Sequence, residues 1–432
     1  MQGTGTKVRL MVLSFLQFAV WGAYLTSMGR YLGGVNDTMG AYIGWFYTVQ
    51  GIVSIFMPAI IGIIADRWVP AQRMLAICHA LAAVFMGITA YMGMLKGAEV
   101  SFNDIFWTYT LSVAFYMPTL ALSNSVSYTV LNKANLDTVK AFPPIRVFGT
   151  IGFIVSMLLV DVTRFQFTYE QFFASAVWGL VLAGYCFTLP SCPVNNGGER
   201  KSVASALGFD AFKLFKQKRM AMLFLFSMLL GAALQVSNGF ANTFIGSFAY
   251  DASLADTFAV QHTNILISLS QMSETLCILL IPFFLSRFGI KKVMLLAMFA
   301  WVLRFGFFAV GDPAMPKVLF FVASMIVYGV AFDFFNISGS LFVDNEVSES
   351  QRSSAQGLFM LMTNGLGASI GVIAAQAVVD HYTHSVSKLN EVTGQLEFFT
   401  VGDWSSAWYI FAGYALVIAL VFAVVFKEKK RA

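Results

Sequence analysis

The segment Ser286-Arg287-Phe288-Gly289-Ile290-Lys291-Lys292 places cations and a glycine between two long apolar runs, 259–286 and 293–311. Each run has about the 20 apolar residues that a helix needs to cross a bilayer. A related segment, Ala65-Asp66-Arg67-Trp68, follows the apolar run 41–65. Aligning Arg67 with Arg287 gives an offset of 220 residues, close to half of the 432-residue chain. The sequence therefore predicts two similar membrane-embedded halves.

The composition agrees with a membrane protein. Hydrophobic residues make up 58% of the chain, charged residues make up 11%, and the mean hydropathy is +0.73. Soluble proteins average about 25% charged residues, so these charges are too few to cover a water-facing surface. A soluble multidomain enzyme, a disordered chain and a nucleic-acid binder are thereby excluded. The four cysteines have no CxxC spacing, which predicts free thiols rather than a disulfide framework or a zinc site.

Apolar runs continue along the chain on both sides of these two segments. Twelve runs are long enough to span a bilayer, at 8–30, 41–65, 74–95, 104–128, 146–163, 170–190, 220–246, 259–286, 293–311, 317–343, 354–380 and 405–426. We therefore predict an all-α membrane protein with twelve transmembrane helices. Its six-helix halves are 1–190 and 220–432, and a linker, 191–219, joins them.

The basic residues predict the orientation. Of the 27 Lys and Arg residues, 21 flank the runs on one side and five on the other, and Arg304 lies inside a run. An excess of Lys and Arg marks the cytoplasmic side, and an even number of spans puts both termini there. The first run has no clear cleavage site and is followed by further spans, so we predict no cleavable signal peptide.

The linker has an amphipathic segment. It places Phe209, Phe212 and Phe215 at helical spacing beside Lys213 and Lys216. This pattern predicts a helix that lies at the cytoplasmic interface.

Charges inside the apolar runs are the first candidates for function, since each costs about 2.5–3.5 kcal/mol at a helix centre. Asp333 shares a helix face with Asn336 and Ser340 through +3 and +4 spacing. A buried carboxylate of this kind is suited to carry a proton. The alternative is a structural ion pair with Arg304 or Arg146.

Glu274 is the second carboxylate inside a run. It shares a helix face with Gln271 and Cys277. A carboxylate beside an amide can hold a vicinal diol, so Glu274 is a candidate for substrate binding or for the coupled proton. A hydrogen bond between helices is the alternative.

Arg146, Thr150 and Phe153 line one face of the fifth run at +4 and +3 spacing. Pro143 and Pro144 precede them and can begin a helix. The guanidinium and the hydroxyl suit a polar substrate, and the phenyl ring suits stacking on a flat one. An arginine at a cytoplasmic helix end is, alternatively, ordinary topology.

Amides form a further stripe in the seventh run, at Gln235, Asn238 and Asn242. Amides pair with both donor and acceptor edges of a base or sugar, whereas hydrogen bonds between helices are the alternative. Gln17, Trp21 and Tyr24 form a similar stripe in the first run, for which polar packing is at least as good a reading.

Other notable residues have simpler interpretations. Arg304 and His79 are predicted to be structural. Asp66 and Arg67 are predicted to form a cytoplasmic latch between the halves, with plain topology charges as the alternative. The glycines of the segment 365–371 are predicted to allow close helix packing.

Long stretches of the chain resemble the nucleoside:proton symporters of the major facilitator superfamily. The resemblance covers nearly the whole chain and is carried by Leu13-Ser-Phe-Leu-Gln17-Phe-Ala-Val-Trp21-Gly22, Ala141-Phe-Pro-Pro-Ile-Arg146-Val-Phe-Gly-Thr150-Ile-Gly-Phe153, Gln271-Met-Ser-Glu274, Ile281-Pro-Phe-Phe-Leu-Ser-Arg287, Met325-Ile-Val-Tyr328-Gly-Val-Ala-Phe332-Asp333 and Ser354-Ala-Gln356-Gly.

This resemblance implies the major facilitator fold and a proton-coupled nucleoside importer of the bacterial inner membrane. It implies that the nucleoside is surrounded by Arg146, Thr150, Phe153, Gln235, Asn238, Gln271, Glu274, Tyr328 and Phe332. Asp333 or Glu274 would carry the proton, and Asp66 and Arg67 would gate. The expected partners are nucleosides, protons and the lipid bilayer. A monomer is expected, with no nucleic acid and no cofactor besides the coupling proton.

Other functions remain open at this level. A transporter of another polyhydroxylated solute such as a sugar, a drug exporter, and a non-transporting sensor on the same fold are the alternatives. The sequence contains no HExxH, GxSxG or Walker motif, so an enzyme is not predicted.

Overall fold

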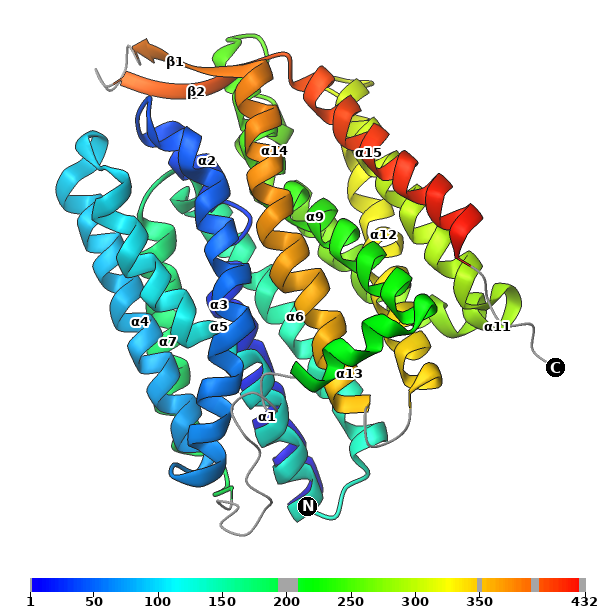
Figure 1. Cartoon of the computed structure of the whole chain (residues 1–432). Coiled ribbons are helices and arrows are strands. Elements are labelled where there is room, and N and C mark those ends of the chain that lie inside the picture. Colours follow the sequence, from blue (N-terminus) through cyan, green and yellow to red (C-terminus); the bar gives the residue numbers. More distant parts are fainter. Residues whose placement is uncertain (1, 193–208, 348–351, 390–395, 427–432) are drawn as a thin grey trace. The chain divides into compact units, whose positions relative to one another are not determined.

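The computed structural model describes residues 2–192, 209–347, 352–389 and 396–426, and they are largely helical (Figure 1). The chain forms two compact units. Unit 1 comprises Met1–Tyr42 and Ile52–Leu207, and unit 2 comprises Ile43–Gly51 and Gly208–Ala432. Each of the twelve predicted runs lies mostly in helical segments. In the described part, nine helical stretches are at least 18 residues long and apolar enough to cross a membrane.

Unit 1 takes its helices from the first part of the chain. They are α1 (Gln2–Gly22), α2 (Met28–Val35), η1 (Met39–Tyr42), α3 (Ile43–Arg67), α4 (Ala71–Lys96), η2 (Gly97–Glu99), α5 (Phe102–Lys133), α6 (Thr138–Val162), η3 (Phe165–Phe167) and α7 (Glu170–Cys186). The first nine residues of α3 are grouped with unit 2.

The first apolar run is not one continuous helix, as its sequence predicted. It is divided into α1 and α2 by turns at residues 23–27. The amides of Tyr24 and Leu25 both bond to the carbonyl of Trp21, at 3.3 and 3.0 Å, so the regular helical ladder ends there. At this point Gly22 lies against the backbone of Phe153 on α6, where a side chain would collide. The break therefore falls directly after a close approach of α1 to α6.

Unit 2 contains the remaining helices and a hairpin. Its elements are η4 (Phe209–Lys216), α9 (Lys218–Ser247), η5 (Phe248–Tyr250), α10 (Phe258–Gln261), α11 (Thr263–Val310), α12 (Val318–Glu346), α13 (Arg352–Met360), η7 (Leu361–Gly367), α14 (Ala368–Tyr382), β1 (Thr383–Leu389), β2 (Leu396–Gly402) and α15 (Trp404–Val425).

Helix α11 contains two of the predicted spans. They meet at Gly289, whose φ of 78° and ψ of 169° are not helical. Glycine adopts positive φ without the steric penalty of a side chain. Gly289, in the segment 286–292, thus divides the eighth predicted span from the ninth by a kink in α11.

Close packing by glycine, predicted for the segment 365–371, is confirmed. Side chains added at Gly367 and Gly371 would collide with Met228 and Ala232 of α9, and one at Gly231 would collide with the backbone of Thr363. Small residues let helix backbones approach each other in this way. The approach occurs at η7, a π-helical turn of the kind that is frequent at functional sites.

The predicted amphipathic helix of the linker is a 3₁₀ helix, η4. Residues three apart eclipse each other in this geometry, and the rings of Phe212 and Phe215 accordingly stack at 5.9 Å. The ring of Phe215 also contacts that of Phe224 on α9, at 5.3 Å. The side chain of Phe209 and the residues 193–208 lie outside the described part of the chain.

Two strands between α14 and α15 were not predicted. They pair antiparallel with Thr383 opposite Gly402, and Figure 1 shows them at one end of α14. Lys388 of β1 donates to the carbonyl of Tyr250 at 3.4 Å, and the Tyr250 ring lies 5.9 Å from that of Phe399. The hairpin is therefore held against η5 within unit 2.

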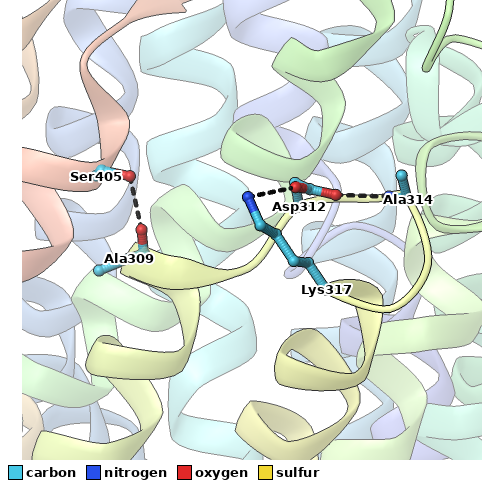
Figure 2. A network of polar contacts seen from close by, with 5 residues as sticks. All are labelled: Ala309, Asp312, Ala314, Lys317 and Ser405. Carbon is cyan, nitrogen blue, oxygen red and sulfur yellow. Dashed lines mark hydrogen bonds and ion pairs between the residues drawn. The ribbon is translucent and has the colours of Figure 1, made fainter.

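Beside the hairpin, polar contacts hold the turn between α11 and α12 (Figure 2). Asp312 accepts from the Ala314 amide at 2.8 Å and pairs with Lys317 at 3.2 Å. The Ser405 hydroxyl at the start of α15 donates to the Ala309 carbonyl at 2.6 Å. These contacts fix the end of α11 to α15.

Candidate functional site

The carboxylates Glu274 and Asp333 lie on two helices of unit 2 that are tightly packed. The Ser273 hydroxyl on α11 donates to the Ile326 carbonyl on α12. Gly329 lies against Ser273, since a Cβ there would be 2.5 Å from its carbonyl oxygen. This contact brings the α11 residue Glu274 beside the α12 face that carries Tyr328 and Asp333.

Tyr328 is the centre of this group. It is 4% exposed and lies within interaction range of Gln271, Glu274, Arg304 and Asp333. Asp333 is 5% exposed. Both carboxylates also lie within electrostatic range of Cys277. The structure thus brings together four residues that the sequence singled out: Gln271, Glu274, Tyr328 and Asp333.

An aromatic wall continues along α12. The rings of Tyr328 and Phe332 are parallel within 9° at 5.8 Å. Phe332 also lines a cavity of about 10 Å³ with Trp301, Asn336 and Thr363. That volume is at the lower limit for one water molecule. A flat ring system and hydrogen-bonding groups are therefore adjacent on one helix.

Asn336 and Ser340, which were predicted to share a helix face with Asp333, form hydrogen bonds with other groups of the protein. The Asn336 amide donates to the Phe332 carbonyl of its own helix at 3.0 Å. Ser340 and Gln356 of α13 bond to each other twice, at 2.8 and 3.0 Å. These two residues therefore serve helix packing, because their polar groups are hydrogen-bonded within the protein.

The amides of the α9 stripe, Gln235, Asn238 and Asn242, do not all have the same role. Gln235 is 8% exposed, and its Oε1 has no hydrogen-bond partner among the described residues. Asn238 is half-buried. Asn242 donates to Asn264 Oδ1 at 2.8 Å, so its interpretation as a bond between helices is correct. Gln235 and Asn238 remain candidates for substrate binding.

Arg304 is not the ion-pair partner of Asp333 that the sequence offered as an alternative. Its guanidinium bonds to Ser237, Ser270 and the carbonyl of Ser324. These partners are neutral, and the described residues give Arg304 no carboxylate contact. An ion pair between Asp333 and Arg304 is therefore not what the structure shows.

The candidates of unit 1 lie on α6. The Arg146 guanidinium lies 3.9 Å from the centroid of the Phe18 ring on α1, a cation–π contact. Phe153 is 6% exposed and meets the Trp21 ring edge-to-face at 6.5 Å. Thr150, which lies between Arg146 and Phe153 in the sequence, is half-buried.

The prediction that Pro143 and Pro144 begin this helix is wrong. Helix α6 begins at Thr138. The Ala141 amide already bonds to the Asp137 carbonyl at 2.8 Å, ahead of both prolines. The prolines therefore fall inside the helix near its start, and Arg146 lies more than two turns from the helix start.

The gating candidates Asp66 and Arg67 occupy the last two positions of α3. Their side chains lie outside the described part of the structure. Among the residues that were placed, no group of three His, Cys, Asp or Glu side chains could hold a metal ion.

One buried acid was missed by the sequence reasoning. Asp161 is fully buried near the end of α6 and accepts from the Gln166 amide at 3.1 Å. It lies within the predicted span 146–163, so the rule that singled out Asp333 applied to it as well. The serines around Arg304 were also missed, because buried serine hydroxyls carry no pattern in the sequence.

Comparison with known proteins identifies what this arrangement is similar to. A family model described as "Nucleoside H+ symporter" matches residues 4–431. The xanthosine permease of Escherichia coli K12 is 48% identical over 420 residues, covering 97% of this chain and 96% of the permease. Nucleoside permease NupG of the same organism is 47% identical over 424 residues, covering 98% and 96%. A crystal structure of nucleoside transporter NupG matches with a TM-score of 0.86 over 98% of this chain and 100% of that chain.

Proposed function

The chain belongs to the nucleoside H+ symporter family, and from that premise we propose which of its residues bind the nucleoside and the proton. It is a proton-coupled nucleoside transporter with the major facilitator fold. Its helices make it a multi-pass membrane protein. Because 21 of the 27 basic residues flank one side, we assign that side to the cytoplasm together with both termini. The inner membrane of a bacterium is the proposed location.

Nine residues are proposed to contact the nucleoside. In unit 2, its contacts are Gln235, Asn238, Gln271, Glu274, Tyr328 and Phe332; in unit 1, they are Arg146, Thr150 and Phe153. The proposal is supported by the chemistry of these groups. Amides and a carboxylate hydrogen-bond to ribose hydroxyls and base edges, and stacking of a base on an aromatic ring contributes about 1–3 kcal/mol in nucleic-acid sites.

Asp333 is proposed to carry the coupled proton. The single observation that supports this most strongly is the burial of Asp333 in one group with Glu274 and Tyr328. Two ionised carboxylates near each other repel, and a buried one such as Asp333 also lacks water. Protonation of Asp333 relieves both costs, and nucleoside contacts at Glu274 then favour the same loaded state. Asp66 and Arg67 are proposed to gate the alternation between the two sides.

The test is uptake into proteoliposomes under an imposed pH gradient, with uridine, adenosine, guanosine, xanthosine and a free sugar as solutes. The wild-type protein is expected to accumulate nucleosides but not the sugar. The Asp333→Asn variant is expected to bind nucleosides and exchange them, because its contacts remain, but to lose accumulation driven by the gradient.

The matched control is Asp380→Asn. Asp380 is another acid of unit 2, exposed near the end of α14, and it accepts from Gln376 at 2.7 Å. Accumulation by this variant should equal that of the wild-type protein. Undiminished accumulation by Asp333→Asn would remove the proton from this residue, and uptake of the sugar alone would overturn the substrate assignment.

A further inference from the structure

Arg304 is a buried cation that the proposed function does not use. It lies in the second half of α11 and is 2% exposed. A cation at this depth is costly, and replacing a buried charge by an apolar side chain often stabilises a protein. The neutral surroundings of Arg304 repay only part of that cost. A function for the guanidinium beyond stability would account for a cation at this position.

The guanidinium joins three helical segments. Its Nε and Nη2 donate to the Ser237 hydroxyl on α9, at 2.9 and 2.6 Å. Its Nη1 donates to the Ser270 hydroxyl in the first half of α11 at 3.3 Å, and to the Ser324 carbonyl on α12 at 2.8 Å. The Ser324 hydroxyl donates back to the Arg304 carbonyl at 2.9 Å. A planar fork with donors on three nitrogens makes this arrangement possible, and lysine has no equivalent.

Each partner lies next to a proposed substrate contact in the sequence. Ser237 stands between Gln235 and Asn238. Ser270 directly precedes Gln271, and Ser324 lies about one helical turn before Tyr328. Arg304 thus fixes the three segments at the level where they carry these contacts.

The guanidinium also holds an aromatic ring. It lies 4.5 Å from the centroid of the Tyr328 ring, a distance at which a cation–π contact is favourable. Trp301 meets the same ring edge-to-face at 6.0 Å, and Phe332 is stacked parallel to it. Arg304 and Trp301 thus both contact the ring of Tyr328, which in turn stacks on Phe332.

We propose that Arg304 is a positioning residue for nucleoside binding, which acts through Ser237, Ser270 and the ring of Tyr328 without touching the substrate. The proposal rests on the proposed function. It separates Arg304 from a purely structural role, because a structural residue would change stability but leave the geometry of the site in the folded protein unchanged. Small displacements of binding groups weaken recognition strongly.

The experiment measures equilibrium binding of uridine to the full-length protein, together with its thermal unfolding midpoint. Arg304→Lys keeps the charge and removes the fork, and it is expected to weaken binding roughly tenfold. Arg287→Lys is the matched control, since Arg287 lies on the same helix but is exposed at its kink, and its affinity should equal that of the wild-type protein.

A double variant tests the route through Tyr328. If Arg304 acts through that ring, Arg304→Lys should weaken binding much less than tenfold when Tyr328→Leu is already present, because coupled residues are not additive. Should Arg304→Lys fail to fold, Ser270→Ala removes one bond to the fork and is expected to weaken binding about threefold, an effect of the size of one hydrogen bond.

A lower unfolding midpoint with unchanged affinity in Arg304→Lys, or in Ser270→Ala where that variant replaces it, would overturn the proposal. A full additional tenfold loss in the double variant would overturn the route through Tyr328. Failure of the proposed function is distinct from both, because the wild-type protein would then neither bind uridine nor accumulate it under a pH gradient.

Discussion

Each unit buries a polar cluster beside its proposed substrate contacts, and the two clusters differ in charge. In unit 1 the cluster is centred on Gln17 of α1. The Gln17 amide donates to the Thr119 hydroxyl at 2.7 Å, its Oε1 lies 2.8 Å from His79 Nε2, and its carbonyl accepts from the Tyr116 hydroxyl at 2.8 Å. In unit 2 the cluster is centred on the cation Arg304.

The cluster of unit 1 is built from pairwise hydrogen bonds around Gln17. Since Gln17 Oε1 can only accept, Nε2 of the fully buried His79 ring carries a hydrogen. Its Nδ1 has no hydrogen-bond partner in the described part of unit 1. His79 and Tyr116 line the same cavity of about 10 Å³. The structural role predicted for His79 fits this arrangement.

Both clusters reach a proposed substrate contact through an aromatic ring. In unit 1, the Tyr116 ring lies 6.0 Å from Trp21, whose ring lies 6.5 Å from Phe153. In unit 2, Arg304 contacts Tyr328 directly. A neutral amide and a buried guanidinium thus occupy comparable places. The charged centre needs several dipoles at once, so unit 2 should be more sensitive to the loss of one partner.

The largest effect is expected from Ser237→Ala in unit 2. This change removes the one hydroxyl oxygen that accepts both guanidinium bonds, and a hydrogen bond to a charged group contributes about 1.5–3 kcal/mol. We expect the free energy of unfolding in mixed micelles to fall by about 2–3 kcal/mol. Titration with a denaturing detergent measures it.

Ser227→Ala is the control for this variant. Ser227 is a fully buried serine of the same helix whose hydroxyl donates only to the Leu223 carbonyl at 2.7 Å, one turn earlier. It should cost well under half as much as Ser237→Ala. Equal losses would mean that the charge at Arg304 adds nothing to the cluster.

The cluster of unit 2 also shows which residues could be predicted from the sequence and which could not. Asp333 and Glu274 were found because a carboxylate is rare in an apolar run and must be explained wherever it occurs. The role of Arg304 was not found. Its partners are two serine hydroxyls and a carbonyl, and helix packing alone determines which of many buried serines meet it.

The fold was predicted for a similar reason. A spanning helix needs about 20 apolar residues whatever it packs against, so all twelve runs could be located. The break after Gly22 and the kink at Gly289 depend on local backbone geometry, which hydropathy does not record. The hairpin of β1 and β2 lies outside the apolar runs and has short strands, so the same rule had nothing to detect.

A smaller effect is expected from Gln17→Met in unit 1. Methionine has a similar length but cannot bond to His79 or Thr119, so two neutral hydrogen bonds are lost. We expect the free energy of unfolding to fall by about 1–2 kcal/mol. The measurement is the same detergent titration.

The reference for Gln17→Met is Ser112→Ala. The Ser112 hydroxyl makes one neutral bond, to the Ala82 carbonyl at 2.7 Å, apart from the Gln17 cluster. It should cost less than Gln17→Met. A loss for Gln17→Met that exceeds the loss for Ser237→Ala would reverse the comparison between the neutral and the charged cluster.

The smallest effect is expected at Asp403, where an acid makes two hydrogen bonds in water rather than in the membrane. Asp403 precedes α15 and accepts from the Ser406 hydroxyl at 2.5 Å and from the Ser406 amide at 3.0 Å. The bond from the hydroxyl, followed by that from the backbone amide, lowers the pKa of Asp403. A lowered pKa stabilises the fold above the pKa of the unfolded state, and this contribution is lost as the pH falls through the folded value.

Asp403→Ala should therefore lower the unfolding midpoint at neutral pH by less than either buried variant, and Asp403→Asn should lower it still less, since asparagine also caps helices. The difference between Asp403→Ala and the wild-type protein should shrink as the solution is made acidic. If it instead stays constant through the acidic range, the neutral side chain caps α15 as well as the carboxylate does. In that case charge adds stability in this protein only where it is buried, as at Arg304, and the contrast between the two clusters becomes sharper.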